Sequence, residues 1–169
     1  LYAAEYIPPN AKVIDVGTGG GFPSVPLAVA REDIEMTAID SVGKKVNFVS
    51  EACQTLGIKI NAFPARAEEI AKKEFRESFD VCVSRAVADM RVLAELCLPL
   101  VKKGGIFIAY KGECEEELEN AKPAIKALGG KTREVKTFVR HCLIIVDKIS
   151  ATNIKYPRRY AKILKEAIK

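Results

Sequence analysis

The sequence predicts an α/β fold in which a mostly parallel, seven-stranded sheet carries helices on both faces. Short apolar runs alternate along the chain with segments whose apolar residues recur at helical spacing. A glycine-rich turn follows the first apolar run directly, where parallel α/β folds place their ligands. The last two runs have no helix between them, which predicts an antiparallel strand at one edge of the sheet. We expect residues 1–169 to form a single domain.

The apolar runs predict the positions of the seven strands. They lie at 13–16, 36–39, 58–63, 79–83, 106–110, 132–138 and 141–147. A tight turn is expected between the last two strands.

Helices are expected between most of these strands. They lie at 23–30, 44–56, 67–73, 91–98, 115–128 and 160–168. The second has apolar residues at helical spacing from Val46 to Leu56, and Gly57 follows as a C-cap. Pro23 is expected in the first turn of the first helix, and Pro99 ends the fourth.

The composition is that of an ordinary globular protein, with 49% hydrophobic and 29% charged residues. No apolar run approaches the roughly 18 residues that a membrane-spanning helix needs. No basic-then-apolar leader is present, so we expect a cytoplasmic protein without a membrane partner. The net charge is +5, with an acidic stretch at 113–119 and a basic tail at 148–169. This asymmetry permits a nucleic-acid partner without proving one.

The cysteines favour a reduced protein. They are Cys53, Cys82, Cys97, Cys114 and Cys142, and no two of them form a CxxC pair. An odd number without paired spacing predicts buried, apolar cysteines rather than a disulfide framework. Cys114 is the least certain, because it lies in the acidic stretch. Since the chain has one histidine, a zinc site of the Cys/His type is not expected and no metal is predicted.

The glycine-rich stretch VIDVGTGGGFPS at 13–24 predicts a ligand site, because glycines allow positive φ and a close approach to the backbone. Dinucleotides and S-adenosylmethionine (SAM) both use such loops. The dinucleotide pattern GxGxxG fits poorly, since Phe22 or Ser24 occupies its third glycine position. Asp15 disfavours a pyrophosphate, and Pro23 removes an amide that a phosphate would need. SAM has no phosphate and carries two cationic groups, so the loop favours SAM.

Asp40 ends the second predicted strand and should lie beside the glycine loop. A carboxylate there can accept both hydroxyl groups of an adenosine ribose. NAD sites use the same arrangement, so Asp40 supports nucleoside binding without separating the two ligands. A strand-end aspartate that caps the next helix is the alternative. The candidate cofactor residues from this reasoning are Asp15, Gly17, Thr18, Gly19, Gly21, Asp40 and Ser41.

The segment after the fourth predicted strand reads SRAVAD at 84–89. It lacks the Asn/Asp-Pro-Pro-aromatic run of enzymes that methylate exocyclic amines, and also the thiol nucleophile of cytosine-C5 enzymes. Arg85 lies here, and near a methyl donor an arginine can bind a carboxylate or phosphate, or stack on a base. A surface arginine without a ligand is the alternative.

Seven segments carry a resemblance to a known family. They are DVGTGGGFPSVPLA (15–28), IDSVGKKVNFV (39–49), ARAEEI (65–70), VSRAVADM (83–90), YKGE (110–113), VRHCLIIVDK (139–148) and YPRR (156–159). Together they resemble the RsmG family, also called GidB, in order and over almost the whole chain. The combination of DVGTGxGFP, DSxGKK and SRA is specific.

This resemblance implies a Rossmann-like class I SAM-dependent methyltransferase that acts on N7 of a guanine in 16S ribosomal RNA, alone or in a small-subunit precursor. Carried over from the family, the cofactor contacts are Gly17, Phe22, Ala67, Glu68 and Arg85. Guanine N7 has a lone pair and no proton, so no general base is needed. We therefore assign no catalytic residue, and name Arg85 and Lys111 as positioning candidates.

RNA should be held through its phosphates and by stacking. The candidate contacts are Lys44, Lys45, Lys111, Arg140, His141, Arg158 and Arg159. The alternative for the tail is an amphipathic helix that docks on the domain and exposes a basic face. For His141 the alternative is a structural imidazole.

The sequence departs from the family pattern in three places. Ser24 stands where the family usually has glycine, and Ala161 and Ile163 stand where its tail usually has glycine and proline. The N-terminal helical part of the family is expected to be missing here. Two other functions stay open, an NAD-linked oxidoreductase and a non-catalytic SAM-binding module.

Overall fold

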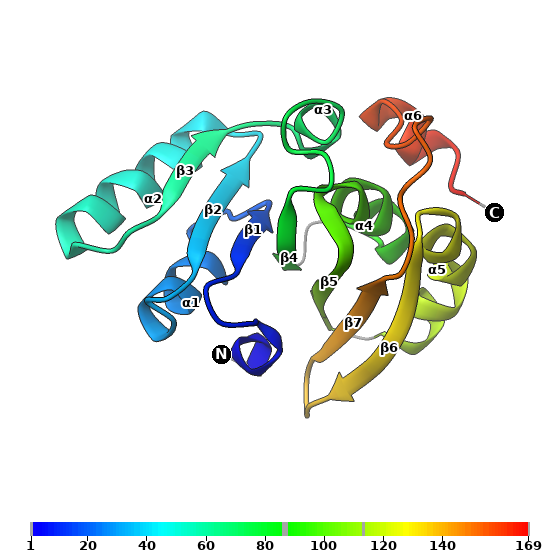
Figure 1. Ribbon diagram of the computed structural model, residues 1–169, viewed down its shortest axis with the longest axis horizontal. Helices are drawn as coiled ribbons and strands as arrows, with labels where there is room; N and C mark the ends of the chain where they lie inside the picture. The colour runs from blue at the N-terminus through cyan, green and yellow to red at the C-terminus, as the bar shows by residue number, and fades with distance from the viewer. Residues whose placement is uncertain (1, 86–87, 113, 169) are drawn as a thin grey trace.

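A seven-stranded sheet with the order β3-β2-β1-β4-β5-β7-β6 forms the centre of the computed structural model, which describes residues 2–85, 88–112 and 114–168 (Figure 1). The strands are β1 (Lys12–Val16), β2 (Glu35–Asp40), β3 (Asn61–Pro64), β4 (Phe79–Arg85), β5 (Val101–Lys111), β6 (Gly130–Thr137) and β7 (Cys142–Lys148). β1 to β5 pair in parallel, and β7 pairs antiparallel with both β5 and β6. The predicted fold class is confirmed.

Helices cover both faces of the sheet. They are η1 (Tyr2–Tyr6), α1 (Ser24–Ala30), α2 (Gly43–Leu56), α3 (Ala67–Ile70), α4 (Met90–Cys97), η2 (Leu98–Leu100), α5 (Glu115–Ala127) and α6 (Tyr160–Lys165). One core cluster packs α3, α4, α5 and α6 against one face, and a second cluster packs η1 and α1 against the other. None of these helices is long and apolar enough to cross a membrane.

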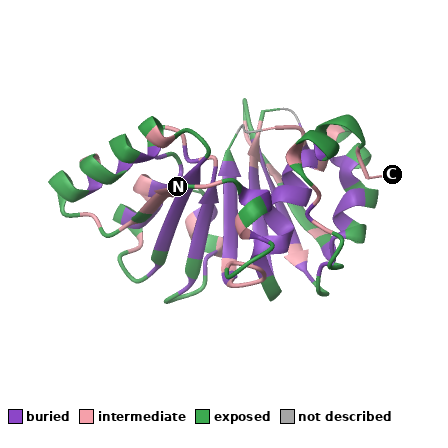
Figure 2. Ribbon diagram, turned by 90° about the horizontal axis from the view of Figure 1, so that it is seen from above, coloured by how far each residue is buried: buried purple, intermediate pink, exposed green. Residues whose placement is uncertain are grey.

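The central strands are apolar along nearly their whole length because both faces of the sheet are covered. In β1, Ile14 belongs to one core cluster and Val13 to the other, and both are fully buried. Figure 2 shows the buried strands between helices whose outer faces are exposed. Side chains can therefore reach a ligand chiefly where the strands end.

The strand order reverses between β1 and β4. From β1 the chain moves outward through β2 to β3, and it then returns to β4 and continues through β5 in the other direction. β1 and β4 pair in parallel with Asp15 opposite Val83. The C-terminal ends of these two strands therefore lie side by side at the position where open α/β sheets bind ligands.

Several element boundaries differ from those expected. α1 begins at Ser24, so Pro23 is the N-cap rather than a first-turn residue. β5 begins at Val101 instead of 106, because the irregular β4–β5 pairing accommodates the glycines of this stretch. α3 ends at Ile70 and α6 at Lys165, earlier than their helical patterns suggested. The reversed strand β7 lies one position inside the edge, which β6 occupies.

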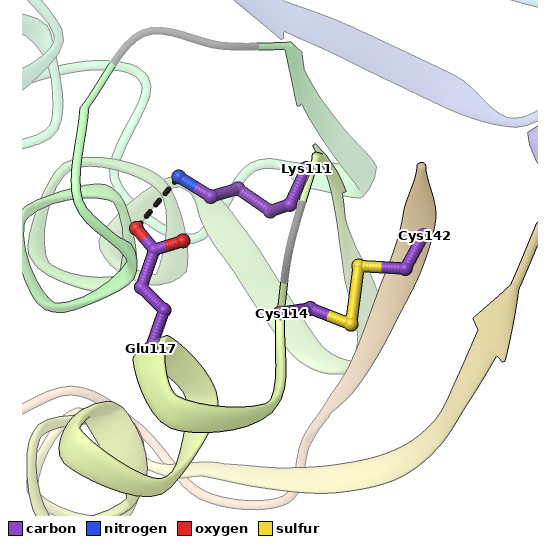
Figure 3. The surroundings of a disulfide bond; sticks show 4 residues. All are labelled: Lys111, Cys114, Glu117 and Cys142. Carbon is purple, nitrogen blue, oxygen red and sulfur yellow. Dashed lines mark ion pairs between the residues drawn. A yellow bond between two sulfur atoms is a disulfide. The ribbon is translucent and has the colours of Figure 1, made fainter. Parts of the chain in front are cut away.

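The expectation of five reduced cysteines is wrong for two of them. A disulfide bond joins Cys114 and Cys142, whose Cα atoms lie 6.5 Å apart (Figure 3). Lys111 of β5 pairs with Cys142 of β7, and Cys114 follows Lys111 closely, so the neighbouring strands bring the two cysteines together. The sequence separation of 28 residues gave no sign of this pairing. The other three cysteines are free and buried, as expected.

Candidate functional site

The loop after β1 is held against the end of β2 by backbone hydrogen bonds. The N–H groups of Gly17 and Thr18 both donate to the carbonyl of Ile39, each at 2.9 Å. The N–H of Gly19 donates to Asp40 Oδ2 at 3.1 Å, and the N–H of Val42 donates to Asp40 Oδ1 at 2.9 Å. The Asp40 carboxylate thus joins the glycine loop to the segment that follows β2.

The buried side chain of Asp15 also holds this loop in place. Its side chain is fully buried, and Oδ2 accepts the N–H of Ser24 at 3.2 Å. The hydroxyl groups of Thr18 and Ser24 lie 2.6 Å apart, so a hydrogen bond joins the loop to the first residue of α1. Asp15 Oδ1 is the one buried side-chain nitrogen or oxygen atom without a hydrogen-bond partner in the described residues. Burial raises the pKa of Asp15 to about 6, although hydrogen bonds from Thr18 and Ser24 and the charge of Arg85 oppose the shift.

The loop glycines have different roles. Gly19 has a φ of +57°, and a Cβ added there would meet nothing within 4 Å, so its backbone faces open space. Gly21 has a φ of +91°, and an added Cβ would lie 2.7 Å from Val25 Cγ2. Gly19 therefore leaves room for a ligand, whereas Gly21 allows the loop to pack against α1.

A pocket of about 520 Å³ lies over this loop and is called the glycine-loop pocket. Nine of the predicted cofactor residues line it: Gly17, Thr18, Gly19, Phe22, Asp40, Ser41, Ala67, Glu68 and Arg85. The predicted residues Asp15 and Gly21 do not line it. Lys45 does, with its Nζ 3.9 Å from Asp40 Oδ2. Leu96 and Tyr160 also line the pocket, and the sequence did not point to either.

The residues of this pocket fit SAM, the cofactor expected from the sequence. Two backbone N–H groups use part of the accepting capacity of Asp40, and its remaining lone pairs can accept ribose hydroxyl groups. Asp15 is buried beneath the loop with an unpartnered oxygen, and its charge favours a cationic ligand over a pyrophosphate. When SAM is bound in the glycine-loop pocket, it supplies the methyl group carried by its sulfonium sulfur.

A second pocket of about 470 Å³, called the adjoining pocket, shares Phe22 and Arg85 with the first. The Arg85 guanidinium lies over the Phe22 ring, 5.4 Å from its centroid. Tyr110 and His141 are among the other lining residues. Burial raises the pKa of Tyr110 to about 12, so its hydroxyl stays protonated at neutral pH. The adjoining pocket is thus lined mainly by aromatic and apolar groups, together with the neutral Tyr110 hydroxyl and the cations Arg85 and Lys111.

Lys111 lines the adjoining pocket but does not offer a free charge to RNA. Its side chain is 10% exposed, and its Nζ lies 2.7 Å from Glu117 Oε1 (Figure 3). It also donates to the carbonyl of Ala88 at 2.7 Å, and Glu117 accepts the N–H of Met90 at 2.8 Å. Lys111 and Glu117 therefore hold the segment that precedes α4, and we withdraw Lys111 as an RNA contact. Nothing in the acidic stretch marked Glu117 for this role.

Arg158 is also bound to a carboxylate, so its charge is not free to bind RNA. It forms an ion pair with Glu95, whose side chain is 1% exposed, with Nη2 to Oε2 at 2.6 Å. We therefore withdraw Arg158 as an RNA contact. The remaining candidates Lys44, Lys45, Arg140, His141 and Arg159 are exposed. Ala86 and Val87 of the SRAVAD segment lie outside the described residues.

Another cavity, of about 1000 Å³, lies between the start of α5 and the β6–β7 turn and shares Gly112 and His141 with the adjoining pocket. Four acidic residues line it, namely Asp89, Glu115, Glu116 and Glu117. Their charge disfavours a nucleic acid on the α5 side of this cavity, whereas Phe138, Arg140 and His141 line its other side. No three His, Cys, Asp or Glu side chains gather closely enough to hold a metal ion in the described part of the chain.

Comparisons with known proteins agree with this geometry. The family described as "GidB: rRNA small subunit methyltransferase G" matches residues 1–146. The chain is 48% identical over 166 residues to "Ribosomal RNA small subunit methyltransferase G" of Clostridium perfringens (strain 13 / Type A), a match that covers 93% of this chain and 70% of that one. It is 42% identical over 178 residues to the protein of the same name from Clostridium botulinum (strain Loch Maree / Type A3), covering 100% of this chain and 74% of that one.

Solved structures at lower identity share the fold. A SAM-dependent methyltransferase from Aquifex aeolicus superposes with a TM-score of 0.67 at 19% identity, over 85% of each chain. The antibiotic-resistance methyltransferase Kmr superposes with a TM-score of 0.68 at 21% identity, over 82% of this chain and 87% of that one.

Replacing Asp40 should weaken SAM binding. In Asp40→Ala we expect an increase in the SAM dissociation constant of at least about tenfold, because the ribose loses an acceptor and the loop loses its link to Val42. Isothermal titration calorimetry measures the change. Asp33→Ala is the matched control, since Asp33 also accepts a backbone N–H but lies outside both pockets. Equal SAM affinity in the two variants would remove Asp40 from the site.

SAM affinity should fall below neutral pH because Asp15 then becomes protonated. Its folded pKa of about 6 lies above its ordinary value, so the free protein binds a proton as the pH falls through 6. A cationic ligand favours the ionised carboxylate, and we expect the dissociation constant to rise about tenfold from pH 7 to pH 5. Asp15→Asn, which cannot titrate, should show a flat profile over this range. A parallel pH dependence in both proteins would contradict the assignment.

Proposed function

The chain belongs to the GidB family of small-subunit ribosomal RNA methyltransferases, and we propose that it transfers a methyl group from SAM to N7 of a guanine in 16S ribosomal RNA. The substrate is the RNA itself or a precursor of the small ribosomal subunit. The observation that carries this proposal is the junction of two pockets at Phe22 and Arg85.

The two pockets suit the two reactants. The glycine-loop pocket contains the acids and open backbone that fit SAM, whereas the adjoining pocket contains aromatic and apolar groups that fit a base. Phe22 lies in the loop after β1 and Arg85 is the last residue of β4, and the strand order places these two strands side by side. A base in the adjoining pocket therefore meets the methyl-bearing end of the cofactor at these residues.

The chain's contribution to the reaction is positioning. Guanine N7 attacks through its own lone pair, so no side chain has to remove a proton. Phe22 and Arg85 fix the boundary at which the two reactants meet, and Lys111 with Glu117 holds the segment after β4 beside it. Alignment of this kind can lower a barrier by roughly 7 to 11 kcal/mol in favourable cases.

Three stacked rings beside the adjoining pocket, of which Tyr2 and His141 are exposed and Phe138 is partly buried, support RNA as the substrate. Tyr2 stacks on Phe138 with centroids 4.0 Å apart, and Phe138 stacks on His141 at 4.8 Å. Tyr2 and His141 also line the adjoining pocket. The exposed cation Arg140 lies in the same turn. We call Tyr2, Phe138 and His141 the ring platform, which suits stacking of a nucleotide next to the methylated one.

Methyl transfer tests the proposal directly. Full-length protein, SAM labelled in its methyl group and small-subunit RNA that lacks this modification should give labelled 7-methylguanosine after digestion. Parallel reactions with naked RNA and with small-subunit particles show which substrate is used. Asp40→Ala should lose most of the signal. Cofactor binding without labelled RNA would indicate a non-catalytic module, and label on another atom would contradict the choice of N7.

Loss of a ring from the platform should weaken RNA use without affecting SAM. Stacking of one base on an aromatic ring contributes roughly 1 to 3 kcal/mol, so His141→Ala should raise the KM for RNA about five- to a hundredfold. Steady-state kinetics at saturating SAM measures this change. Val139→Ala is the matched control, because Val139 is fully exposed in the same turn and carries no ring. The same KM in both variants would exclude the platform from RNA binding.

A further inference from the structure

Tyr160 lies far along the chain from the other residues of the glycine-loop pocket. It is the first residue of α6 and lines the pocket together with Leu96 of α4. Its ring also packs against the core cluster that includes Ile163 of the same helix. Figure 1 shows α6 at the same end of the molecule as α3, whose residues Ala67 and Glu68 line the pocket as well. The C-terminal tail thus completes a pocket that the glycine loop begins.

A buried ion pair fixes the chain two residues before Tyr160. Arg158 Nε donates to Glu95 Oε1 at 2.8 Å, and Nη2 donates to Oε2 at 2.6 Å. The backbone N–H of Arg158 also donates to Glu95 Oε1 at 2.8 Å. Glu95 directly precedes Leu96, so one turn of α4 provides both the anchor and part of the pocket lining. The three bonds fix the direction in which the chain enters α6.

Hydrogen bonds other than those of the Glu95–Arg158 pair also attach the C-terminal tail to the domain. Arg76 donates to the carbonyls of Tyr156 and Thr152 at 2.9 and 2.6 Å, and buried Lys148 donates to Thr152 Oγ1 at 2.6 Å. A buried ion pair adds little stability compared with well-packed apolar residues, because both charges lose water. Attachment of the tail therefore does not explain why the buried Glu95 carboxylate is hydrogen-bonded to Arg158. Orientation of the residues that follow Arg158 does explain it.

We propose that Glu95 and Arg158 are positioning residues that hold Tyr160 against the nucleoside of SAM, so that the tail serves cofactor binding rather than RNA binding. Asp40 and the residues after β3 lie in the same pocket and fit the ribose and base of that nucleoside. The Tyr160 ring adds an aromatic surface for the base. The inference rests on the proposed function for the identity of the cofactor.

Tyr160→Ala tests the contact while leaving the ion pair intact. Calorimetry on the full chain should show a SAM dissociation constant raised about tenfold, which corresponds to the loss of one base–aromatic contact. Leu164→Ala is the matched control, because Leu164 is 57% exposed on the same helix. Because Tyr160→Ala also removes packing against the core cluster, SAM affinity is measured well below the melting temperatures of both variants. A SAM affinity equal to that of the control would overturn the proposal.

Arg158→Ala and Arg158→Lys test the positioning. Arg158→Ala should raise the KM for SAM about tenfold and leave kcat and the KM for RNA unchanged at saturating SAM. Arg158→Lys should recover part of the SAM affinity, since an ammonium keeps the charge but not the planar fork. A raised KM for RNA with normal SAM affinity, or an equal loss of both, would overturn the proposal.

The two proposals can fail separately. If the protein binds SAM but labels no RNA, the proposed function fails while the calorimetry on Tyr160→Ala still decides the role of the tail. If Arg158→Ala does not fold, Tyr160→Ala and Arg158→Lys still test whether the tail contributes to SAM binding.

Discussion

The site depends on the hydrogen bonds that hold the glycine loop to the end of β2. The carbonyl of Ile39 accepts two N–H groups of the loop, and Asp40 accepts a third. These bonds fix a backbone that would otherwise be mobile, because glycines have many accessible conformations when unfolded. Asp15 adds a buried acceptor beneath the loop, which leaves one carboxylate oxygen without a partner and raises its pKa. A buried charge of this kind costs stability and favours a cationic ligand nearby.

The order of the strands turns this local arrangement into a site for two reactants. β1 and β4 are neighbours in the sheet although 62 residues lie between them in the sequence. Their C-terminal ends therefore lie side by side where the strand order reverses. Phe22 and Arg85 meet there and separate the two pockets. The acids Asp40 and Glu68 line the glycine-loop pocket, whereas the adjoining pocket has aromatic rings and no acid among the described residues that line it. This division suits a cationic nucleoside cofactor and a planar base, whose reaction needs alignment more than acid–base chemistry.

Charged residues of the same type have different roles in this fold, and burial distinguishes them. Arg158 and Lys111 are largely buried and bound to carboxylates, so they organise the chain around the pockets. Arg140 and Arg159 are exposed and remain available for phosphates. Some of the positive net charge is therefore not available to RNA, and the acidic residues at the start of α5 restrict where RNA can lie.

The sequence by itself determined the alternation of strands and helices, the loop after β1 and the acids beside it, because these features depend on local patterns and on which residues end a strand. It also predicted that Asp40 would lie beside the glycine loop, since parallel strands end at the same edge of a sheet. Only the tertiary structure decided that Cys114 pairs with Cys142, that Glu95 binds Arg158, and that Tyr160 reaches the pocket. These contacts join segments distant in the sequence. They depend on the order of strands and the docking of the tail, which no local pattern of residues encodes.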